Sequence, residues 1–198
     1  MELSTIHFFY VILAVTNMVL DTRQNILGRP LGLIANGISV YIYYSAGFYA
    51  KCLLKCIFAV LNIYGWYQWL YGGENKTRLK VSKTPYSQLV IVAILGLSVA
   101  WGLGKTLTLY SSATFPYWDS LLAVMALTAY WMLVRKKLEA WLLLVPTDAL
   151  YATLLCFKGL YLLSSLHLCY TILATNGYRN WHQSYRQEKS HSATPSGS

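Results

Sequence analysis

The sequence predicts an all-α integral membrane protein, with seven transmembrane helices arranged 3-1-3 as two parallel three-helix repeats around one linking helix. Of its 198 residues, 56% are hydrophobic and only 12% are charged, whereas a soluble domain carries about 25% charged residues. The apolar residues form long runs, and the mean hydropathy is +0.42. Long apolar runs indicate helices because lipid offers the backbone no hydrogen-bonding partner. The third observation is that the chain resembles itself over much of its length.

The first four helices are predicted from runs with few charges. The first run follows Glu2 and lacks the basic start and small-residue cleavage site of a signal peptide, so we expect it to remain as a helix. The second run is uncharged, and the third carries its only charges, Lys51 and Lys55, near one end. The fourth lies between a basic loop and Lys105. These four helices are predicted at residues 3–20, 31–48, 50–71 and 86–104.

The last three helices follow the same logic. The fifth run begins after Pro116 and ends before Arg135, and the sixth is interrupted only by Asp148. The seventh is uncharged from Gly159 to Tyr178. About 20 residues at about 1.5 Å per residue cross the hydrocarbon core of a bilayer. These helices are predicted at residues 116–134, 138–157 and 159–179.

A five-residue pattern occurs twice at the ends of apolar runs. Gly65-Trp66-Tyr67-Gln68-Trp69 and Gly177-Tyr178-Arg179-Asn180-Trp181 are 112 positions apart, and the same offset aligns Arg23 with Arg135. We interpret this as an internal duplication. Because one extra helix lies between the two three-helix repeats, both repeats have the same orientation in the membrane. Many transporters are built from such repeats and bind their substrate between them. The single membrane domain, 1–198, then divides into a first repeat (1–71), a basic cytoplasmic loop with the linker helix (72–106), a second repeat (107–181) and a polar, disordered tail (182–198).

The net charge of +9 is distributed unevenly between the two sides of the predicted membrane. Twelve of the 16 basic residues fall on one side, and the other side holds Lys51, Lys55, Lys105 and Lys158. Because basic loops stay in the cytoplasm, we expect the N-terminus outside and the C-terminus inside. The charge therefore indicates topology, and no nucleic-acid partner is expected.

No pattern in the chain indicates an enzyme. The four cysteines and four histidines are scattered, without the clusters that hold metal ions, and no nucleophile–base arrangement or phosphate-binding glycine loop is present. Cys52 and Cys56 share a helix face but have no His or carboxylate beside them. We therefore expect no catalytic residue, metal or cofactor.

Asp148 is the strongest candidate for a functional residue because it falls near the middle of the sixth helix. A carboxylate at this depth is costly and usually faces a cavity, although it can also be a structural group paired with a lysine or hydroxyls. Pro146 is expected to kink the same helix. The repeat-equivalent of Asp148 is Asn36, beside Gly37. Paired features of this kind indicate a transport site, although Gly37 also fits close helix packing.

Other candidates surround these two positions. Lys55 either extends to the membrane surface or forms an ion pair with Asp148. Asn62 offers donors and an acceptor to a ligand or to a neighbouring helix. Aromatic residues at the helix ends are expected to form an interfacial belt, or alternatively to stack on a flat ligand. The predicted substrate-binding residues are Asn36, Lys55, Asn62, Trp118, Trp141, Asp148, Tyr151 and Asn176.

Several segments resemble one known family. Residues 62–69 read N-I-Y-G-W-Y-Q-W and resemble the N-I-Y-G-W-Y-x-W motif of the PnuC family of vitamin transporters, and residues 115–120, 135–141 and 176–181 resemble further motifs in the same order. The resemblance implies a fold like that of full-length SWEET proteins, often packed as a homotrimer. It also implies passive uptake of a vitamin, made directional when a cytoplasmic kinase phosphorylates the product.

The substrate is predicted from departures from the family pattern. Members that resemble the nicotinamide riboside branch carry Trp, Asn and Gln where this chain has Leu144, Asp148 and Lys55. These departures favour thiamine, whose amine and ring cation suit Asp148, with nicotinamide riboside as the alternative and riboflavin and deoxynucleosides also open. A proton-coupled carrier is a variant of this function. The competing function of another class is a membrane scaffold that transports nothing.

Overall fold

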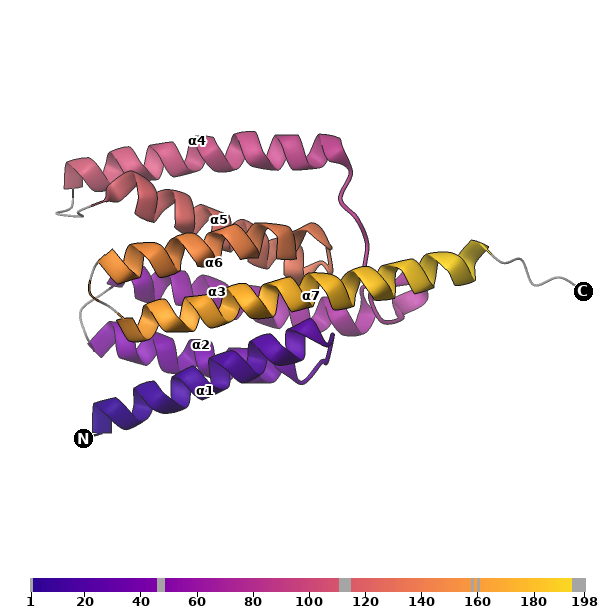
Figure 1. The fold of residues 1–198 in the computed structure, drawn as a ribbon, viewed down its shortest axis with the longest axis horizontal. Coiled ribbons are helices and arrows are strands. Elements are labelled where there is room, and N and C mark those ends of the chain that lie inside the picture. Colours follow the sequence, from indigo (N-terminus) through magenta and orange to yellow (C-terminus); the bar gives the residue numbers. More distant parts are fainter. Residues whose placement is uncertain (1, 46–48, 111–114, 158, 160, 194–198) are drawn as a thin grey trace, which may run out of the picture.

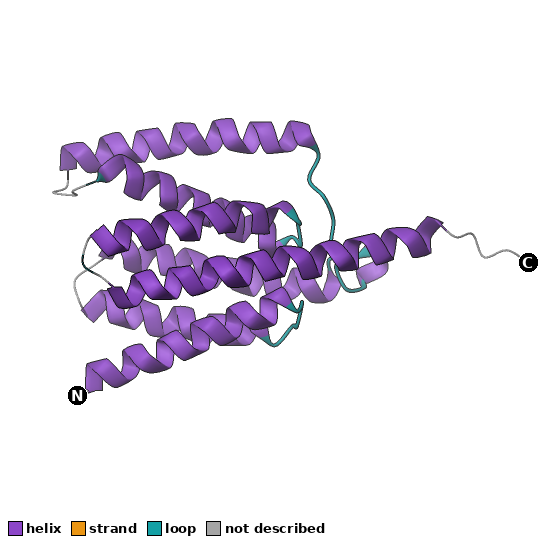
Figure 2. Cartoon of the chain, in the orientation of Figure 1, coloured by secondary structure: helices purple, strands orange, loops and turns teal. Residues whose placement is uncertain are grey.

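The computed structural model describes residues 2–45, 49–110, 115–157, 159 and 161–193. The described residues form seven α-helices and one short 3-10 turn, η1 (Glu74–Lys76). The helices are α1 (Glu2–Thr22), α2 (Gly28–Ser45), α3 (Tyr49–Tyr71), α4 (Tyr86–Tyr110), α5 (Pro116–Val134), α6 (Glu139–Phe157) and α7 (Tyr161–Ala193). Each predicted helix is therefore present, and the drawn part of the chain is helix and loop (Figure 2).

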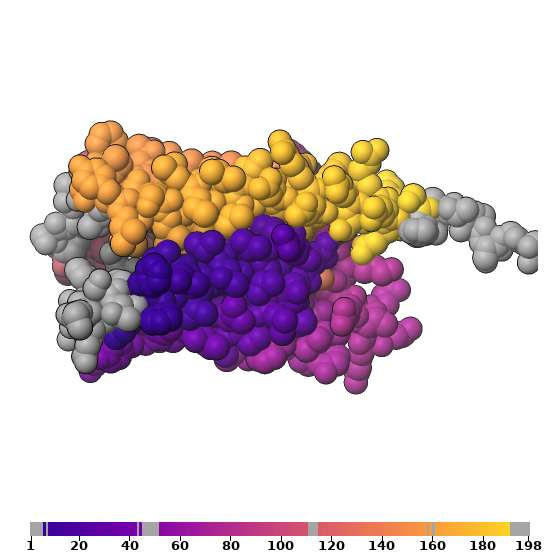
Figure 3. Space-filling view, turned by 60° about the horizontal axis from the view of Figure 1, so that its bottom comes forward, coloured from indigo at the N-terminus to yellow at the C-terminus, as the bar shows by residue number. Residues whose placement is uncertain are grey.

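Six of the helices form a closed ring. Each packs on the next in the order α1, α2, α3, α5, α6, α7, and α7 returns to α1. The contact between α1 and α7 brings the two ends of the chain's helical part together, and the space-filling view shows them side by side (Figure 3). Helix α4 lies outside the ring and packs on α5 (Figure 1). A ring of this kind leaves its centre accessible to side chains from all six members.

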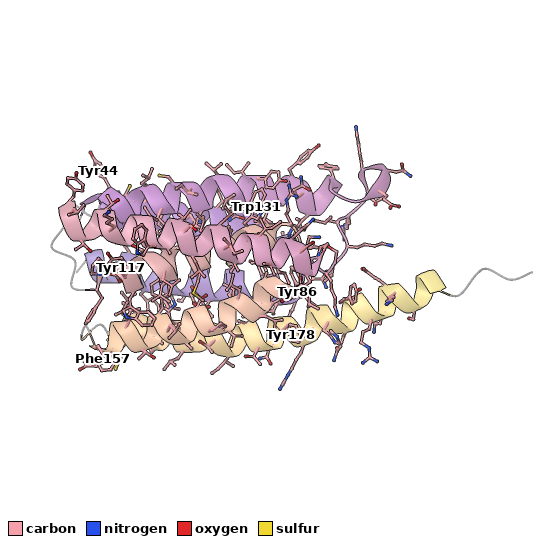
Figure 4. All side chains as sticks on the ribbon, turned by 90° about the horizontal axis from the view of Figure 1, so that it is seen from above. Tyr44, Tyr86, Tyr117, Trp131, Phe157 and Tyr178 are labelled. Carbon is pink, nitrogen blue, oxygen red and sulfur yellow. The ribbon has the colours of Figure 1, made fainter. Side chains whose placement is uncertain are left out.

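The outer surface of the described bundle is apolar. By length and composition α4, α5 and α6 are each able to cross a membrane, and a shorter apolar helix spans Phe8–Thr22. Large apolar side chains of α4, such as Leu95 and Trp101, are about 60% exposed. Exposed aromatic side chains also gather at two levels along the bundle (Figure 4). Such belts are typical of the two membrane–water interfaces. One level holds Tyr44, Tyr117 and Phe157, and the other holds Tyr86 and Trp131, with the partly buried Tyr178 at the same level.

The buried core lies toward one end of the ring, around the repeated Gly-x-x-x-Trp pattern. Trp69 donates its indole N–H to the carbonyl of Val134 at 3.1 Å, and Trp181 donates to the carbonyl of Asp21 at 3.0 Å. The two rings are 5.8 Å apart. Each tryptophan thus ties the third helix of one half of the ring to the end of the first helix of the other half. In both places the five-residue pattern therefore holds two helices together. We call the contacts made by Trp69 and Trp181 the tryptophan clasp.

The α1–α2 and α5–α6 turns have the same backbone conformation. Gln24 and Lys136 both have positive φ, 54° and 50°, and are 112 positions apart. The following residues close matching hydrogen bonds, from Asn25 N to Leu20 O and from Lys137 N to Met132 O, both at 2.9 Å. This is the Schellman arrangement that ends helices. The offset found in the sequence is therefore present in the backbone.

The basic loop before α4 crosses the same end of the ring. Ser82 N donates to the carbonyl of Lys136 and Leu138 N donates to the carbonyl of Ser82, each at 3.0 Å. Glu139 accepts a bond from the Thr84 N–H at 3.0 Å. These bonds hold the loop against the α5–α6 turn, and Val81 is buried there.

The C-terminal segment differs from the prediction. A disordered tail was expected from residue 182, but α7 continues as a helix to Ala193. Contacts with two loops support this extension. Gln24 in the α1–α2 turn donates to the Ser184 hydroxyl at 2.9 Å, and the Lys83 ammonium in the basic loop lies 5.3 Å from the centre of the Tyr185 aromatic ring. At about 1.5 Å per residue the 33-residue helix is longer than a bilayer core is thick. The rest of the expected tail, 194–198, lies outside the described residues.

Candidate functional site

A cavity of about 180 Å³ lies within the ring. Its lining comes from all six ring helices, and no residue of α4 contributes to it. Its polar lining residues are Tyr10, Asn17, Asp21, Asn36, Lys55, Tyr130, Asp148, His167 and Tyr170. A mainly apolar cavity with a few converging polar groups is the usual form of a small-molecule site.

Asp148 forms a close pair with a histidine of the neighbouring helix. The Asp148 carboxylate lies 2.8 Å from Nδ1 of His167, and Asp148 is only 6% exposed. The Tyr151 ring stacks on the imidazole at 5.0 Å, and Tyr170 meets it edge-on at 5.7 Å. The imidazole is therefore held by one hydrogen bond and two rings, which makes the carboxylate tolerable inside a membrane helix.

The sequence analysis overlooked His167, which was regarded as an isolated histidine. A signal for the pair was available in the spacing. Asp148 and His167 are 19 residues apart, and both lie two to three helical turns from the α6–α7 connection. In an antiparallel helix pair, such positions lie at similar depths.

Three of the eight predicted binding residues line this cavity, namely Asn36, Lys55 and Asp148. The ion pair proposed between Lys55 and Asp148 is not formed. The carboxylate is paired with His167 instead, and the Lys55 ammonium lies 5.7 Å from the centre of the Phe58 ring. Lys55 therefore contributes a cation to the cavity wall without neutralising Asp148.

Asn62 lies immediately behind the cavity wall. It is 1% exposed, and neither its amide nitrogen nor its oxygen has a hydrogen-bond partner among the described residues. A Cβ added to Gly32, which lines the cavity, would be 2.5 Å from the Asn62 nitrogen. Buried amide groups without partners are costly. The position thus suits a polar atom entering past Gly32.

The other four predicted residues do not line the cavity. Trp141 was expected to face it but is fully buried in the clasp, 5.3 Å from Trp181. Its ring occupies the space left by Gly177, where a Cβ would be 2.6 Å from the indole. Tyr151 supports His167 from outside the lining. The remaining two, Trp118 at the start of α5 and Asn176 on α7, are exposed.

A buried ion pair lies beneath the cavity and was not foreseen. Asp21, which lines the cavity, pairs with Arg29, and both side chains are almost fully buried. The Arg29 guanidinium also lies 4.2 Å from the centre of the Trp69 ring. In the sequence analysis Arg29 is only one of the twelve basic residues counted on the cytoplasmic side. The α1–α2 turn folds it back under the ring, where removing either partner would leave an uncompensated charge.

Comparisons with known proteins agree with this architecture. The family model described as nicotinamide mononucleotide transporter matches residues 4–183. The nicotinamide riboside transporter PnuC of Escherichia coli (strain K12) is 28% identical over 196 residues, covering 86% of this chain and 82% of the relative. The protein of the same name from Shigella flexneri matches equally well.

A solved structure has the same fold. The structure described as the crystal structure of the vitamin B3 transporter PnuC has a TM-score of 0.73 at 18% identity, and the match covers 94% of this chain and 83% of that one. The resemblance to the PnuC family is thereby confirmed. The chain belongs to the nicotinamide mononucleotide transporter family and is a membrane transporter rather than an enzyme.

Proposed function

We propose that this chain carries nicotinamide riboside across the membrane by facilitated diffusion through the centre of its helix ring. The observation that supports this most is the central cavity, whose polar lining comes from both halves of the ring. Its relatives from two bacteria are nicotinamide riboside transporters. Thiamine, favoured from the residues alone, has no support among these relatives, so the alternative substrate becomes the main proposal.

The cavity chemistry suits a flat cationic ligand with polar substituents. Nicotinamide riboside has a pyridinium ring, a carboxamide and ribose hydroxyls. Asp148 supplies a counter-charge, and the Phe58 and Tyr170 rings supply surfaces on which a cationic ring packs favourably. Asn17 and Asn36 add amide donors and acceptors for the carboxamide and hydroxyls. Lys55 opposes the cation, so Asp148 is essential to the charge balance of the site.

The size of the cavity bears on how the ligand enters. Its volume of about 180 Å³ is below the roughly 300–1,000 Å³ of typical small-molecule sites. The ring must therefore widen to admit a whole nucleoside. The clasp formed by Trp69 and Trp181 closes one end of the ring, so in this proposal release at that end requires those two bonds to break.

The proposed architecture consists of two parallel repeats, 1–71 and 107–181, related by an axis along the ring. If α1, α2 and α3 correspond to α5, α6 and α7, the contact between α3 and α5 corresponds to a contact between α7 and α1. Both contacts are present. The matched turns at Gln24 and Lys136 support the same relation. This arrangement places the first helices of both repeats in the same direction.

The remaining expectations stay part of this proposal. The end of the ring with the α1–α2 and α5–α6 turns carries Arg23, Arg135 and Lys137, which supports a cytoplasmic position for it. The N-terminus would then lie outside a bacterial inner membrane. We further propose that the chain forms a homotrimer, for which the exposed face of α4 is one available surface. A cytoplasmic kinase would then phosphorylate the imported vitamin and so trap it inside the cell.

Two competing functions remain for the experiment to separate. Thiamine is the second candidate, because Leu144, Lys55 and Asp148, the three positions that depart from the riboside pattern, all line the cavity. The scaffold alternative has nothing in its favour among the transporter relatives. It predicts that removing the Asp148 charge impairs folding, whereas a carrier predicts a folded protein that no longer binds.

The decisive experiment is calorimetric titration of the purified chain with nicotinamide riboside and with thiamine. The variant is Asp148→Asn, and the matched control is Asp119→Asn, a half-buried carboxylate of α5 outside the cavity lining. We expect riboside binding that is weakened at least about tenfold, or 1.4 kcal/mol, in Asp148→Asn only. Thiamine binding with no riboside binding would reverse the substrate assignment. Binding of neither ligand to a folded protein would reject the proposal.

A further inference from the structure

A second cavity, of about 330 Å³, lies at the end of the ring beyond the tryptophan clasp. Its lining shares no residue with the central cavity. It is formed where four segments meet, namely the α1–α2 turn, the end of α3, the basic loop and the α5–α6 turn. Both halves of the ring therefore contribute to it. Nothing in the proposed transport step uses this cavity.

The polar lining of this cavity is cationic. Arg23, Arg78 and Lys136 supply three positive charges, Gln24 and Asn25 supply amides, and none of the lining residues is acidic. Arginine presents a planar fork of N–H donors that matches phosphate oxygens, and lysine adds a compact charge. The lining is therefore a set of donors without a matching anion.

Lys136 is the buried member of this set. It is 7% exposed, its ammonium donates to the Gln24 side-chain oxygen at 3.3 Å, and it lies 4.6 Å from the Trp69 ring centre. Burial lowers the pKa of Lys136 to about 8; Glu188 on α7 acts against this shift, and the cations of Arg29 and Arg78 add to it. An anion that binds in the cavity would add to the effect of Glu188 and stabilise the charged form of Lys136.

We propose that this cavity binds a phosphate group, presented either by an anionic lipid headgroup or by a free phosphate compound. The phosphate accepts hydrogen bonds from Arg23 and Arg78 and neutralises Lys136. Because Arg23 and Gln24 belong to the first half of the ring and Lys136 to the second, the bound anion links the two halves beside the clasp. Binding therefore stabilises the closed form of this end.

The test uses the full chain, purified in neutral detergent, and inorganic phosphate as the probe. The melting temperature is measured at increasing concentrations of sodium phosphate and, separately, of sodium chloride at equal ionic strength. We expect a saturable rise with phosphate beyond that with chloride, as for any ligand that binds only the folded state. The same measurement in nanodiscs with and without phosphatidylglycerol separates the lipid source from the free source.

The variant for this test is Arg23→Gln with Arg78→Gln, and the matched control is Arg179→Gln with Arg186→Gln, two exposed arginines of α7 outside the cavity. The cavity variant should bind phosphate at least about tenfold more weakly, and the control should bind like the parent chain. If the cavity variant does not fold, Arg23→Lys with Arg78→Lys keeps the charges and removes the forks. Two results would overturn the proposal. One is an equal rise in melting temperature with phosphate and with chloride in detergent, together with no stabilisation by phosphatidylglycerol in nanodiscs. The other is an equal loss of phosphate affinity in the cavity variant and in the control.

Discussion

At the scale of single residues, the Asp148–His167 pair is the feature on which the proposed site depends. The Asp148 carboxylate and the His167 imidazole are in contact between α6 and α7 at 2.8 Å, so neither side chain acts alone on a ligand. Tyr151 holds the imidazole from its other side. The pair therefore sets the charge and the hydrogen-bonding pattern that the cavity presents to a cationic substrate.

A double-mutant cycle tests this coupling. Asp148→Asn and His167→Gln should each weaken nicotinamide riboside binding, and the double variant should lose less than the sum of the two losses. We expect a coupling energy of about 1–3 kcal/mol, because contacting polar residues in one network are not additive. Calorimetric titration of the four proteins supplies the measurement. Losses that add within about 0.5 kcal/mol would show that the two side chains act independently.

At the scale of elements, the helix–helix contacts of the clasp depend on the two glycines, Gly65 and Gly177, that begin the repeated five-residue pattern. Gly65 lies against Val134, and Gly177 lies against the Trp141 ring. Each absent side chain lets a helix approach a bulky residue of the other half or of the neighbouring helix. Small residues serve this purpose in membrane helices generally.

Replacing Gly177 by alanine should destabilise the protein. The added Cβ would be 2.6 Å from the Trp141 ring, which is held by Trp181, so α6 and α7 must separate, at a cost of about 1–3 kcal/mol. Gly102→Ala on α4 is the matched control, because a Cβ there meets no described atom within 4 Å. Thermal unfolding in detergent should show a lower melting temperature for the first variant only. Equal melting temperatures would mean that the clasp tolerates the methyl group.

At the scale of the whole molecule, the six-helix ring has two different ends. One carries the clasp, the basic loop and the cationic second cavity, and the other carries the N-terminus (Figure 1). The extended end of α7 also projects beyond the ring at the clasp end (Figure 1). This asymmetry is what the distribution of Lys and Arg along the sequence predicts for a protein inserted in one orientation.

Orientation is measured directly with reporter fusions in a bacterial host. A green fluorescent protein fused to the C-terminus should fluoresce, and an alkaline phosphatase fused there should be inactive. The reporters fused before Glu2 should give the reverse pattern, because we expect the N-terminus outside and the C-terminus inside. An even number of crossings or an inverted protein would give equal or exchanged signals, and either result would contradict the predicted topology.

Much of the fold was predictable from the chain because it depends on local properties. Apolar length determines which segments cross a bilayer, and all seven predicted helices are present among the described residues. The offset of 112 positions found in the sequence also separates Gln24 from Lys136, whose turns share one backbone conformation. Asp148 was also recognised without a structure, because a carboxylate within an apolar run is visible in the sequence itself.

The tertiary structure decided which side chains meet. Asp148 pairs with His167 rather than with Lys55, and Trp141 lies in the clasp rather than in the cavity. Apolar runs that face lipid and protein alike carry little information on the rotation of a helix about its axis. That rotation follows from the packing of glycines, tryptophans and buried charges between helices. The spans are thus properties of the sequence, whereas the site is a property of the closed ring.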